Sequence, residues 1–214
     1  MLYKEPQIIS AATFLLIQKL QARVPLNSFH LVGGTALALQ LGHRDSIDID
    51  LFSQSDFDYL QLTEFLKSEF SFDENFVRKN TIIGFINNIK VDFITHPYQY
   101  INPPVTEEGI TFLSKEDIAA MKLNAIINSG QRLKDFIDIY FLLEHFPMAA
   151  MLDFFERKYP NTNPVVALKA INYFDDIDEA IDQPKLRKPL PLKKIKRRIN
   201  DAVVHANKIF RNDE

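Results

Sequence analysis

The chain has 214 residues, of which 46% are hydrophobic and 25% charged, with a formal net charge of −3. This size and balance predict a globular protein, either one domain with a second lobe or two small domains. The absence of cysteine excludes disulfide bonds and thiolate metal sites. The N-terminus lacks the pattern of a signal peptide, and the apolar run at 8–20 is too short and polar to span a bilayer. We therefore expect a soluble, cytoplasmic protein without a membrane partner.

The modest net charge hides an uneven distribution along the chain. Residues 1–184 hold 15 Lys and Arg against 25 Asp and Glu, a net charge of −10, whereas residues 185–214 hold 10 against 3, a net charge of +7. Eight of these cations fall between Lys185 and Arg198, with no acid among them. Such a stretch indicates contact either with a polyanion or with the acidic body of the protein itself.

The first half of the chain alternates helical and extended patterns. Periodicity predicts helices at 6–20, 35–41 and 56–70, and strands at 29–32, 44–52, 75–79, 81–86, 89–95 and 110–113. Asn87 and Asn88 tolerate the positive φ of a tight hairpin between 81–86 and 89–95. Alternation in the strand at 44–52 predicts that Ile47, Ile49 and Leu51 pack on helices.

Helices dominate the second half. Ser114 is a good N-cap for a helix at 115–128, and further helices are predicted at 134–146, 148–159, 165–174 and 192–210. We therefore predict an α+β fold, a mixed α/β sheet layer with helices followed by a mainly helical lobe. The predicted division is an α/β core at 1–113 and a helical lobe with a basic tail at 114–214.

Three aspartates occur in two of the predicted strands. Asp48 and Asp50 share one face of the strand at 44–52, and Asp92 stands on the polar face of an otherwise apolar strand. Carboxylates on neighbouring strands can share two hard cations, one activating an attacking hydroxyl and the other holding a triphosphate. We therefore expect Asp48, Asp50 and Asp92 to be catalytic and to bind Mg²⁺ or Mn²⁺.

A glycine pair precedes the acidic strand. Gly33 and Gly34 allow close approach of a backbone to an anion, and the N-terminus of the helix that follows at Thr35 offers free N–H groups to phosphate. Arg44 lies between this helix and the acids in the sequence, where it can neutralise carboxylates or contact phosphate. Gly33, Gly34, Thr35 and Arg44 are therefore the predicted nucleotide contacts.

The order of these residues resembles a known signature. The pair Gly33-Gly34, thirteen intervening residues and Asp48-Ile-Asp50 resemble the DNA polymerase β-type nucleotidyltransferase superfamily. The longer string from Gly33 to Phe52 is similar to the AbiEii/AbiGii toxin family, and the blocks at 119–126 and 134–143 agree with it. The resemblance covers about residues 26–145 and implies a polymerase β-like nucleotidyltransferase fold.

The resemblance also implies further site residues and partners. The lysine that matches Lys122 and the acid that matches Asp135 or Asp138 belong to the family's active site. Members are toxins of toxin–antitoxin and phage-defence systems, and some add nucleotides to the acceptor end of tRNA. We therefore expect an NTP as substrate, tRNA or another RNA as acceptor, and an antitoxin protein as partner. Many relatives carry an Arg-Gly pair between the two blocks, where this chain offers Arg132 instead.

Each motif also has an ordinary structural interpretation. The glycine pair fits a turn, Lys122 fits a lysine whose stem covers a packed helix, Asp135 fits a helix cap, and the basic stretch fits a solvated helix face. Three alternative functions follow. The chain could modify a small hydroxylated molecule, bind an antitoxin or RNA without catalysis, or be a metal-dependent glycosyltransferase, for which it is short.

Overall fold

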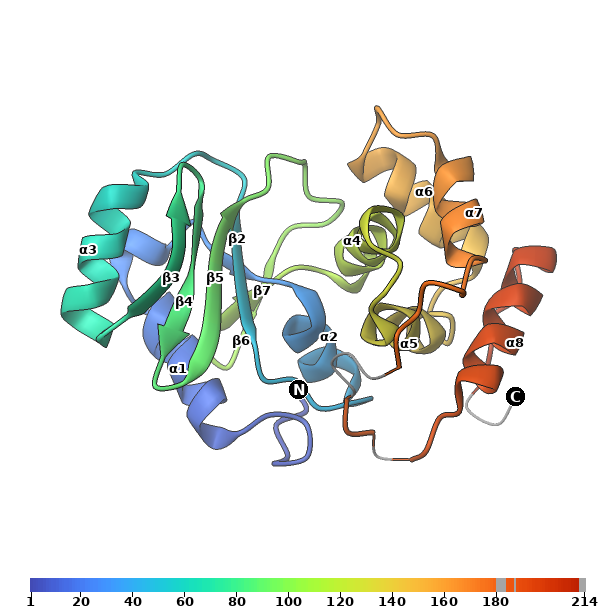
Figure 1. The fold of residues 1–214 in the computed structure, drawn as a ribbon, viewed down its shortest axis with the longest axis horizontal. Helices are drawn as coiled ribbons and strands as arrows, with labels where there is room; N and C mark the ends of the chain where they lie inside the picture. The colour runs from blue at the N-terminus through green and yellow to red at the C-terminus, as the bar shows by residue number, and fades with distance from the viewer. Residues whose placement is uncertain (180–183, 187, 212–214) are drawn as a thin grey trace. The chain divides into compact units, whose positions relative to one another are not determined.

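The computed structural model describes residues 1–179, 184–186 and 188–211. The chain divides into two compact units. The first comprises Met1–Gln99 and Pro103–Leu113, and the second comprises Tyr100–Asn102 and the chain from Ser114 onward. The first unit contains the β-strands, and the second is helical (Figure 1).

One mixed sheet organises the first unit. Within the described residues its seven strands run in the order β3-β4-β5-β2-β1-β7-β6. The pairs β2–β5 and β1–β7 are parallel, and the other neighbours are antiparallel. The strands are β1 (His30–Leu31), β2 (Ile49–Ser53), β3 (Asp73–Arg78), β4 (Thr81–Ile86), β5 (Ile89–Thr95), β6 (Val105–Glu107) and β7 (Ile110–Phe112).

The hairpin between β4 and β5 is confirmed at the predicted bounds. Asn87 and Asn88 take φ values of 50° and 62°. Asparagine accepts this left-handed conformation more readily than most residues, and two such residues give a turn whose twist matches that of the strands. The turn therefore fixes the register in which β5 lies against β4.

Helices α1 (Ala11–Gln21), α2 (Gly33–Leu41) and α3 (Tyr59–Phe70) complete the first unit, with a short 3-10 turn η1 (Val24–Leu26). One face of the sheet forms the core, because Leu51, Phe93 and Ile82 stand in register across β2, β5 and β4 and are fully buried. The other face keeps side chains such as Phe52 and Ile94 half-buried. Alternation along β2 and β5 thus separates the core from a polar face.

The strand predicted at 44–52 begins later than expected, at Ile49. The Ser46 N–H donates to the Ile8 carbonyl at 2.9 Å, and the Asp48 carbonyl accepts the Thr35 hydroxyl. Because these groups bond outside the strand ladder, the segment before Ile49 does not join the sheet. The prediction that Ile47 packs on helices is wrong, since this side chain is 61% exposed.

Several helix ends also differ from the prediction, because caps near the ends set them. The Ser10 side chain accepts the Thr13 N–H, so α1 starts after Ser10. Asp58 accepts the N–H groups of Leu60 and Gln61, so α3 starts after Asp58. Strand β6 was not predicted, and the last helix ends at residue 204 rather than 210.

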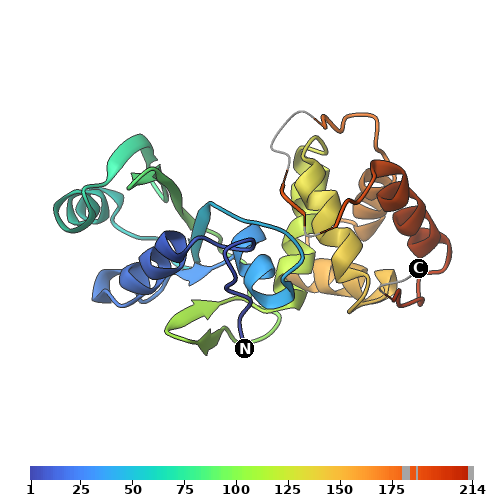
Figure 2. The same ribbon diagram turned by 90° about the horizontal axis from the view of Figure 1, so that it is seen from below.

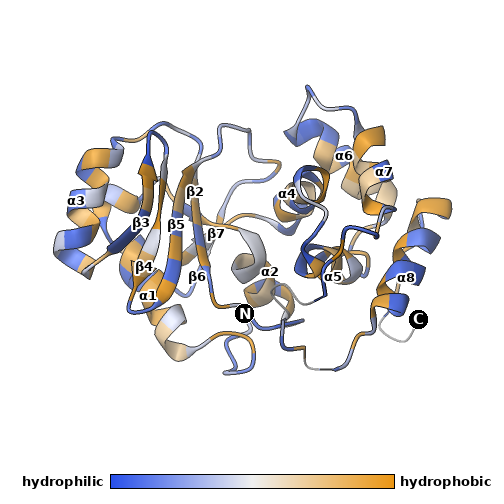
Figure 3. Cartoon of the chain, viewed as in Figure 1, coloured by the Kyte–Doolittle hydropathy of each residue, from blue (hydrophilic) through white to orange (hydrophobic). Residues whose placement is uncertain are grey.

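The second unit contains α4 (Lys115–Asn128), α5 (Leu133–Leu142), α6 (Met148–Lys158), α7 (Pro164–Ile171) and α8 (Leu192–Val204), which cluster together in Figure 2. Helix α4 has the predicted bounds, and the Ser114 side chain accepts the Asp117 N–H as its cap. A fully buried ion pair of 2.7 Å between Asp117 and Lys158 joins α4 to α6. Polar and apolar residues alternate along α8 (Figure 3), whose apolar side is buried. Within the described residues, no helix has the length and apolarity needed to cross a membrane.

Candidate active site

Asp50 and Asp92 lie opposite each other on the neighbouring strands β2 and β5. The parallel register pairs Asp50 with Asp92 and Ile49 with Val91. Partners in register point to the same face, and adjacent strands are about 4.8 Å apart. Asp92 is 7% exposed and Asp50 is half-buried. Asp48 lies two residues before Asp50, just ahead of β2 and outside the sheet, and its charge acts on Lys90 together with those of Asp50 and Asp92.

Gly33 begins α2 and lies directly against Asp50. Its φ is +67°, and a Cβ at this position would lie 2.4 Å from Asp50 Oδ2. Only glycine accepts both this conformation and this contact without strain. The first N–H groups of a helix lack partners within it, and the helix dipole is positive at this end. The start of α2 therefore has the N–H groups and the positive dipole end that favour an anion, and the Asp50 side chain lies against it.

Arg44 makes a second close contact with α2. Its side chain is buried, and a Cβ on Gly34 would lie 2.2 Å from Arg44 Nη2. Arg44 Nη1 donates to the Asp45 carbonyl at 2.8 Å. The guanidinium therefore lies against the first turn of α2 and adds positive charge there.

Thr35 faces the segment that leads to Asp48. Thr35 is buried, its hydroxyl lies 2.7 Å from Ser46 Oγ, and it donates to the Asp48 carbonyl. These bonds fix the backbone at Asp48 and give Thr35 a positioning role. Its contact with nucleotide stays a prediction.

We call the side of the sheet that carries Asp50 and Asp92, with the adjoining Asp48, the acidic face. Lys90, which the sequence interpretation overlooked, is a cation at this face. Its Nζ donates to Asp92 Oδ2 at 2.7 Å. Burial alone would lower the pKa of Lys90, but the hydrogen bond to Asp92 and the charges of Asp92, Asp50 and Asp48 raise it above its ordinary value. The available signal was the spacing: Lys90 precedes Asp92 by two residues in a strand, and so shares its face.

The acidic face offers carboxylate donors for a metal ion, but in the described residues these donors are not gathered as closely as the ligands of a bound metal. Among the residues that the structure describes, no three Asp, Glu or His side chains are grouped closely enough to hold a metal ion. The donor set still fits a hard cation, because Mg²⁺ and Mn²⁺ prefer carboxylate oxygens. Asp92 Oδ1 is buried, and no described group gives it a hydrogen bond. A buried acceptor in this state is costly unless a cation meets it.

The second unit holds a buried charge cluster on α4 and α5. Lys122 Nζ lies 2.7 Å from Asp135 Oδ1 and 2.7 Å from Asp138 Oδ2, and all three side chains are buried. The structure therefore brings these three predicted residues together within one unit. Asp135 binds Lys122, whereas the N-cap of α5 is Arg132. The ion pairs join α4 to α5.

The basic stretch divides into outward-facing and buried cations. Lys193 and Arg197 of α8 are exposed and Lys194 and Lys196 are half-buried, whereas Arg198 is only 3% exposed. Arg198 donates to Glu144 Oε1 at 2.6 Å, and its Cζ lies 3.7 Å from the centre of the Tyr140 ring. Of the two alternatives for the basic stretch, Arg198 therefore fits contact with the protein's own acids rather than with a polyanion. Arg187 and residues 212–214, which belong to the predicted basic tail, lie outside the described residues.

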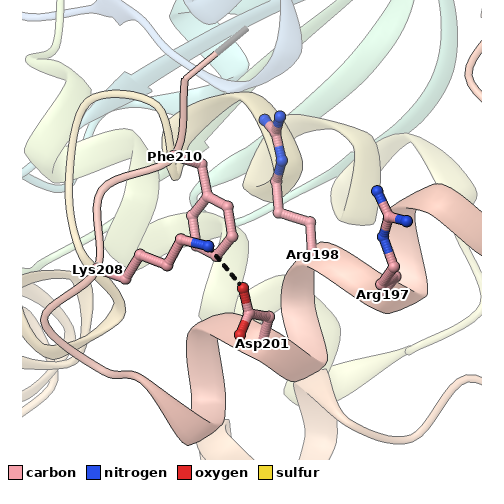
Figure 4. A pocket seen from close by; sticks show the side chains of 5 residues that line it. All are labelled: Arg197, Arg198, Asp201, Lys208 and Phe210. Carbon is pink, nitrogen blue, oxygen red and sulfur yellow. Dashed lines mark hydrogen bonds and ion pairs between the residues drawn. The ribbon is translucent and has the colours of Figure 1, made fainter. Parts of the chain in front are cut away.

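A pocket of about 350 Å³ lies beside α8 (Figure 4). Its lining consists of Arg197, Arg198, Asp201, Lys208 and Phe210. Lys208 binds Asp201 at 2.9 Å and lies 4.6 Å from the centre of the Phe210 ring. Arg198 Nη2 also donates to the Arg211 carbonyl at 3.2 Å, so this bond and the Lys208–Asp201 pair hold the segment after α8 against the helix.

Two solved structures share this fold. A candidate nucleotidyltransferase from Helicobacter pylori is 17% identical, with a TM-score of 0.59 over 92% of each chain. JHP933 from H. pylori is 18% identical, with a TM-score of 0.51 over 92% of this chain and 89% of that one. The predicted α+β fold class is confirmed.

The sequence comparisons identify the family. An uncharacterized protein of Aquifex aeolicus is 30% identical over 161 residues, which are 72% of this chain and 78% of the relative. The family model described as nucleotidyl transferase AbiEii toxin, type IV toxin–antitoxin system, matches residues 15–207. The chain therefore belongs to the AbiEii nucleotidyltransferase toxin family.

Proposed function

We propose that this protein transfers a nucleotide from an NTP to an RNA acceptor such as tRNA, in a reaction that depends on two Mg²⁺ or Mn²⁺ ions. Membership in the AbiEii family supports nucleotidyl transfer, a toxin role and an antitoxin partner. The observation that carries the site is the register of Asp50 with Asp92, beside Gly33 at the start of α2. It combines hard-cation ligands with a helix terminus suited to phosphate.

Asp48, Asp50 and Asp92 are the proposed metal ligands. The bound ions would neutralise the triphosphate and activate the acceptor hydroxyl. The chain's own contribution is positioning, because Asp50 lies against Gly33 and the Asp48 backbone is bonded to Thr35. Groups held in place before substrate arrives need no reorganisation during the reaction.

The triphosphate is proposed to bind at the first turn of α2. Gly33, Gly34 and Thr35 supply N–H groups there, and Arg44 supplies a guanidinium against Gly34. Since backbone N–H groups and a fixed guanidinium bind phosphate oxygens well, this end of α2 suits the leaving pyrophosphate.

Lys122 and Asp135 are proposed as active-site residues on the resemblance to the family. Both belong to the helical lobe, which we propose as a functional domain distinct from the sheet domain. Their ion pair gives each residue a structural role as well. A variant of Lys122 must therefore be judged on nucleotide affinity and on stability separately.

The acceptor is proposed to be RNA because of the outward side of α8. We call Lys193, Lys194, Lys196 and Arg197 the α8 basic face. Lys193 and Arg197 lie on the side of the helix opposite the buried Ile195 and Ile199. Lys194 and Lys196 lie on its flanks, and Lys196 Nζ is 5.3 Å from the centre of the Phe174 ring. Four cations on one helix face without an intervening acid attract a chain of phosphates.

The test is transfer of labelled nucleotide. The purified protein is incubated with total RNA and each α-labelled NTP in Mg²⁺, and the RNA is resolved on a gel. Labelled RNA in the size range of tRNA is expected, and its loss in Asp48→Asn and Asp50→Asn. Asp73→Asn is the matched control, because Asp73 is an exposed aspartate on β3 of the same sheet.

Other outcomes separate the alternatives. Label in small molecules of a cell extract, with none in RNA, would point to a small hydroxylated acceptor. Growth arrest by the Asp48→Asn form in a bacterial host would show that binding, rather than transfer, is the activity.

A further inference from the structure

Lys90 is a counter-ion of the acidic face. Its ammonium lies 2.7 Å from Asp92 Oδ2, and its side chain is 38% exposed against 10% for Asp92. Asp50 stands beside Asp92 in register, and Asp48 lies two residues before Asp50. Carboxylates gathered in this way repel one another unless a cation lies among them. Lys90 supplies such a cation at Asp92.

The Lys90 ammonium also opposes the binding of a divalent ion at this site. The Lys90 ammonium bound to Asp92 Oδ2 opposes a metal ion at the same carboxylate, because two cations a few Å apart repel strongly at a partly buried site. The other oxygen, Asp92 Oδ1, has no hydrogen bond from any described group, so it is the oxygen that a metal ion would reach first. Metal and lysine therefore compete for one side chain.

Lys90 can leave Asp92 without any change in the sheet. Its backbone is held in β5 by pairing with Phe85 of β4, while its charge sits at the end of a flexible four-carbon stem. A released ammonium needs a new anion, and a triphosphate bound at the start of α2 would bring several. Breaking the Lys90–Asp92 ion pair therefore costs little free energy when metal and NTP bind together, and much more when the metal binds alone.

We propose that Lys90 is a built-in competitor of the catalytic metals, which keeps their affinity low in the absence of NTP and turns to the triphosphate when both bind. This inference rests on the proposed metal dependence and adds the residue that controls it. Metal and NTP should each raise the affinity for the other by the same factor, because coupling between two ligands is reciprocal.

Binding of Mn²⁺ to the metal-free, full-length protein tests the proposal without any turnover. Free Mn²⁺ is measured by electron paramagnetic resonance, with and without the α,β-methylene analogues of the four NTPs, which cannot transfer a nucleotide. Lys90→Met keeps the stem and removes the charge, so it should bind Mn²⁺ alone at least about tenfold more tightly than the wild type. Most of the analogue-induced gain in Mn²⁺ affinity should disappear in this variant.

Two controls separate charge from other effects. Lys90→Arg keeps the charge and should retain the weak Mn²⁺ binding of the wild type. Lys79→Met removes an exposed lysine from the β3–β4 turn of the same sheet, where it pairs with Asp56 at 3.7 Å, and should change nothing. Thermal unfolding gives a second readout: Lys90→Met should lower the Tm of the metal-free protein, and Mn²⁺ should restore it. If Lys90→Met is too unstable to purify, Lys90→Gln takes its place.

The failures are distinguishable. Equal Mn²⁺ affinity in the wild type and Lys90→Met would overturn the competition and leave the proposed function intact. An unchanged Tm in metal-free Lys90→Met would overturn the role as counter-ion. A wild type that binds no Mn²⁺ with any analogue would instead overturn the metal dependence on which the inference rests.

Discussion

The glycine pair shows how single residues set this site, because each glycine is required by a different neighbour. Gly33 leaves room for the Asp50 carboxylate, and Gly34 leaves room for the Arg44 guanidinium. A carboxylate and a guanidinium are thus brought to consecutive positions of one helix start. A side chain at either glycine would push one charged group away from the first turn of α2.

Gly33→Ala should therefore cost more than an ordinary substitution of a left-handed glycine. The left-handed conformation alone costs alanine about 1 kcal/mol, and the contact with Asp50 Oδ2 adds to it. Gly109→Ala is the matched control. Gly109 has a φ of +76°, but a Cβ there would lie 3.9 Å from its nearest neighbour, Gln18 Nε2, which is an ordinary van der Waals contact. Urea unfolding should give a larger loss for Gly33→Ala, and Mn²⁺ binding should fall only there. Equal losses would mean that Asp50 does not need the glycine.

Tyr100 provides a pH-dependent prediction. Burial, together with the charge of Asp117, raises the pKa of Tyr100 to about 12. Because the folded state holds the phenol proton more tightly than the unfolded chain, this contribution to stability is complete below pH 10 and is lost as the pH rises towards 12. Absorbance of tyrosinate should show a component near pH 12 that Tyr100→Phe lacks. A titration unchanged by this substitution would contradict the environment described here.

At the scale of elements, two buried lysines tie α4 into the helical unit. Lys158 on α6 binds Asp117 near the start of α4, and Lys122 on α4 binds Asp135 on α5. Asp117 also accepts the N–H groups of Ile101 and Asn102, so the loop before β6 is attached to the same helix. These ion pairs organise α4 regardless of any catalytic role.

Lys122→Met and Lys158→Met should both destabilise the protein, by about 3–5 kcal/mol each, because each leaves buried carboxylates without a counter-charge. Only Lys122→Met should also weaken NTP binding, if the residue contacts triphosphate as proposed. Lys158 is the matched control, as a buried lysine in an ion pair outside the proposed site. Unfolding in urea and titration with an NTP analogue separate the two effects. Equal NTP affinity in both folded variants would leave Lys122 a structural residue.

Helices and strands were predictable where residues close by in the sequence set their boundaries. Asn87-Asn88 fixes the hairpin of β4 and β5, and Ser114 with Asp117 fixes the start of α4. The strand at 44–52 was mispredicted because Ser46 and Asp48 bond to Ile8 and Thr35, which are distant in sequence. Alternation alone cannot show such bonds.

For the candidate site, the sequence predicted that Asp50 and Asp92 lie on neighbouring strands, as they do, but it did not predict the partners of the nearby charges. Period-two spacing applies to Asp50 but not to Asp48, which lies before β2; the same rule applied to Lys90 would have revealed its ion pair with Asp92. The partners of Arg44 and Arg198 could not be predicted, because Gly34 and Glu144 reach them only through tertiary folding.

At the scale of the whole molecule, the charge asymmetry of the sequence has to be divided between surface and interior. The net charge of +7 on residues 185–214 includes two cations that bind other parts of the protein. Arg198 is buried against Glu144 and Tyr140, and Lys208 binds Asp201. These two cations stabilise the end of the described chain. What remains for a polyanion on α8 is the basic face of four residues.

Neutralising the α8 basic face with Lys193→Gln, Lys194→Gln, Lys196→Gln and Arg197→Gln should therefore weaken RNA binding while leaving stability and NTP affinity nearly unchanged. Each lost phosphate contact should reduce the slope of log K against log salt by about 0.7–0.9. Arg198→Gln is the contrasting variant: it should lower the Tm, because the half-buried Glu144 carboxylate loses this ion pair, without flattening the salt slope. Filter binding of tRNA across a salt series and thermal unfolding measure both. If the fourfold variant instead loses stability and keeps the wild-type salt slope, the basic face serves the protein's own acidic body, and the RNA acceptor loses its support from charge.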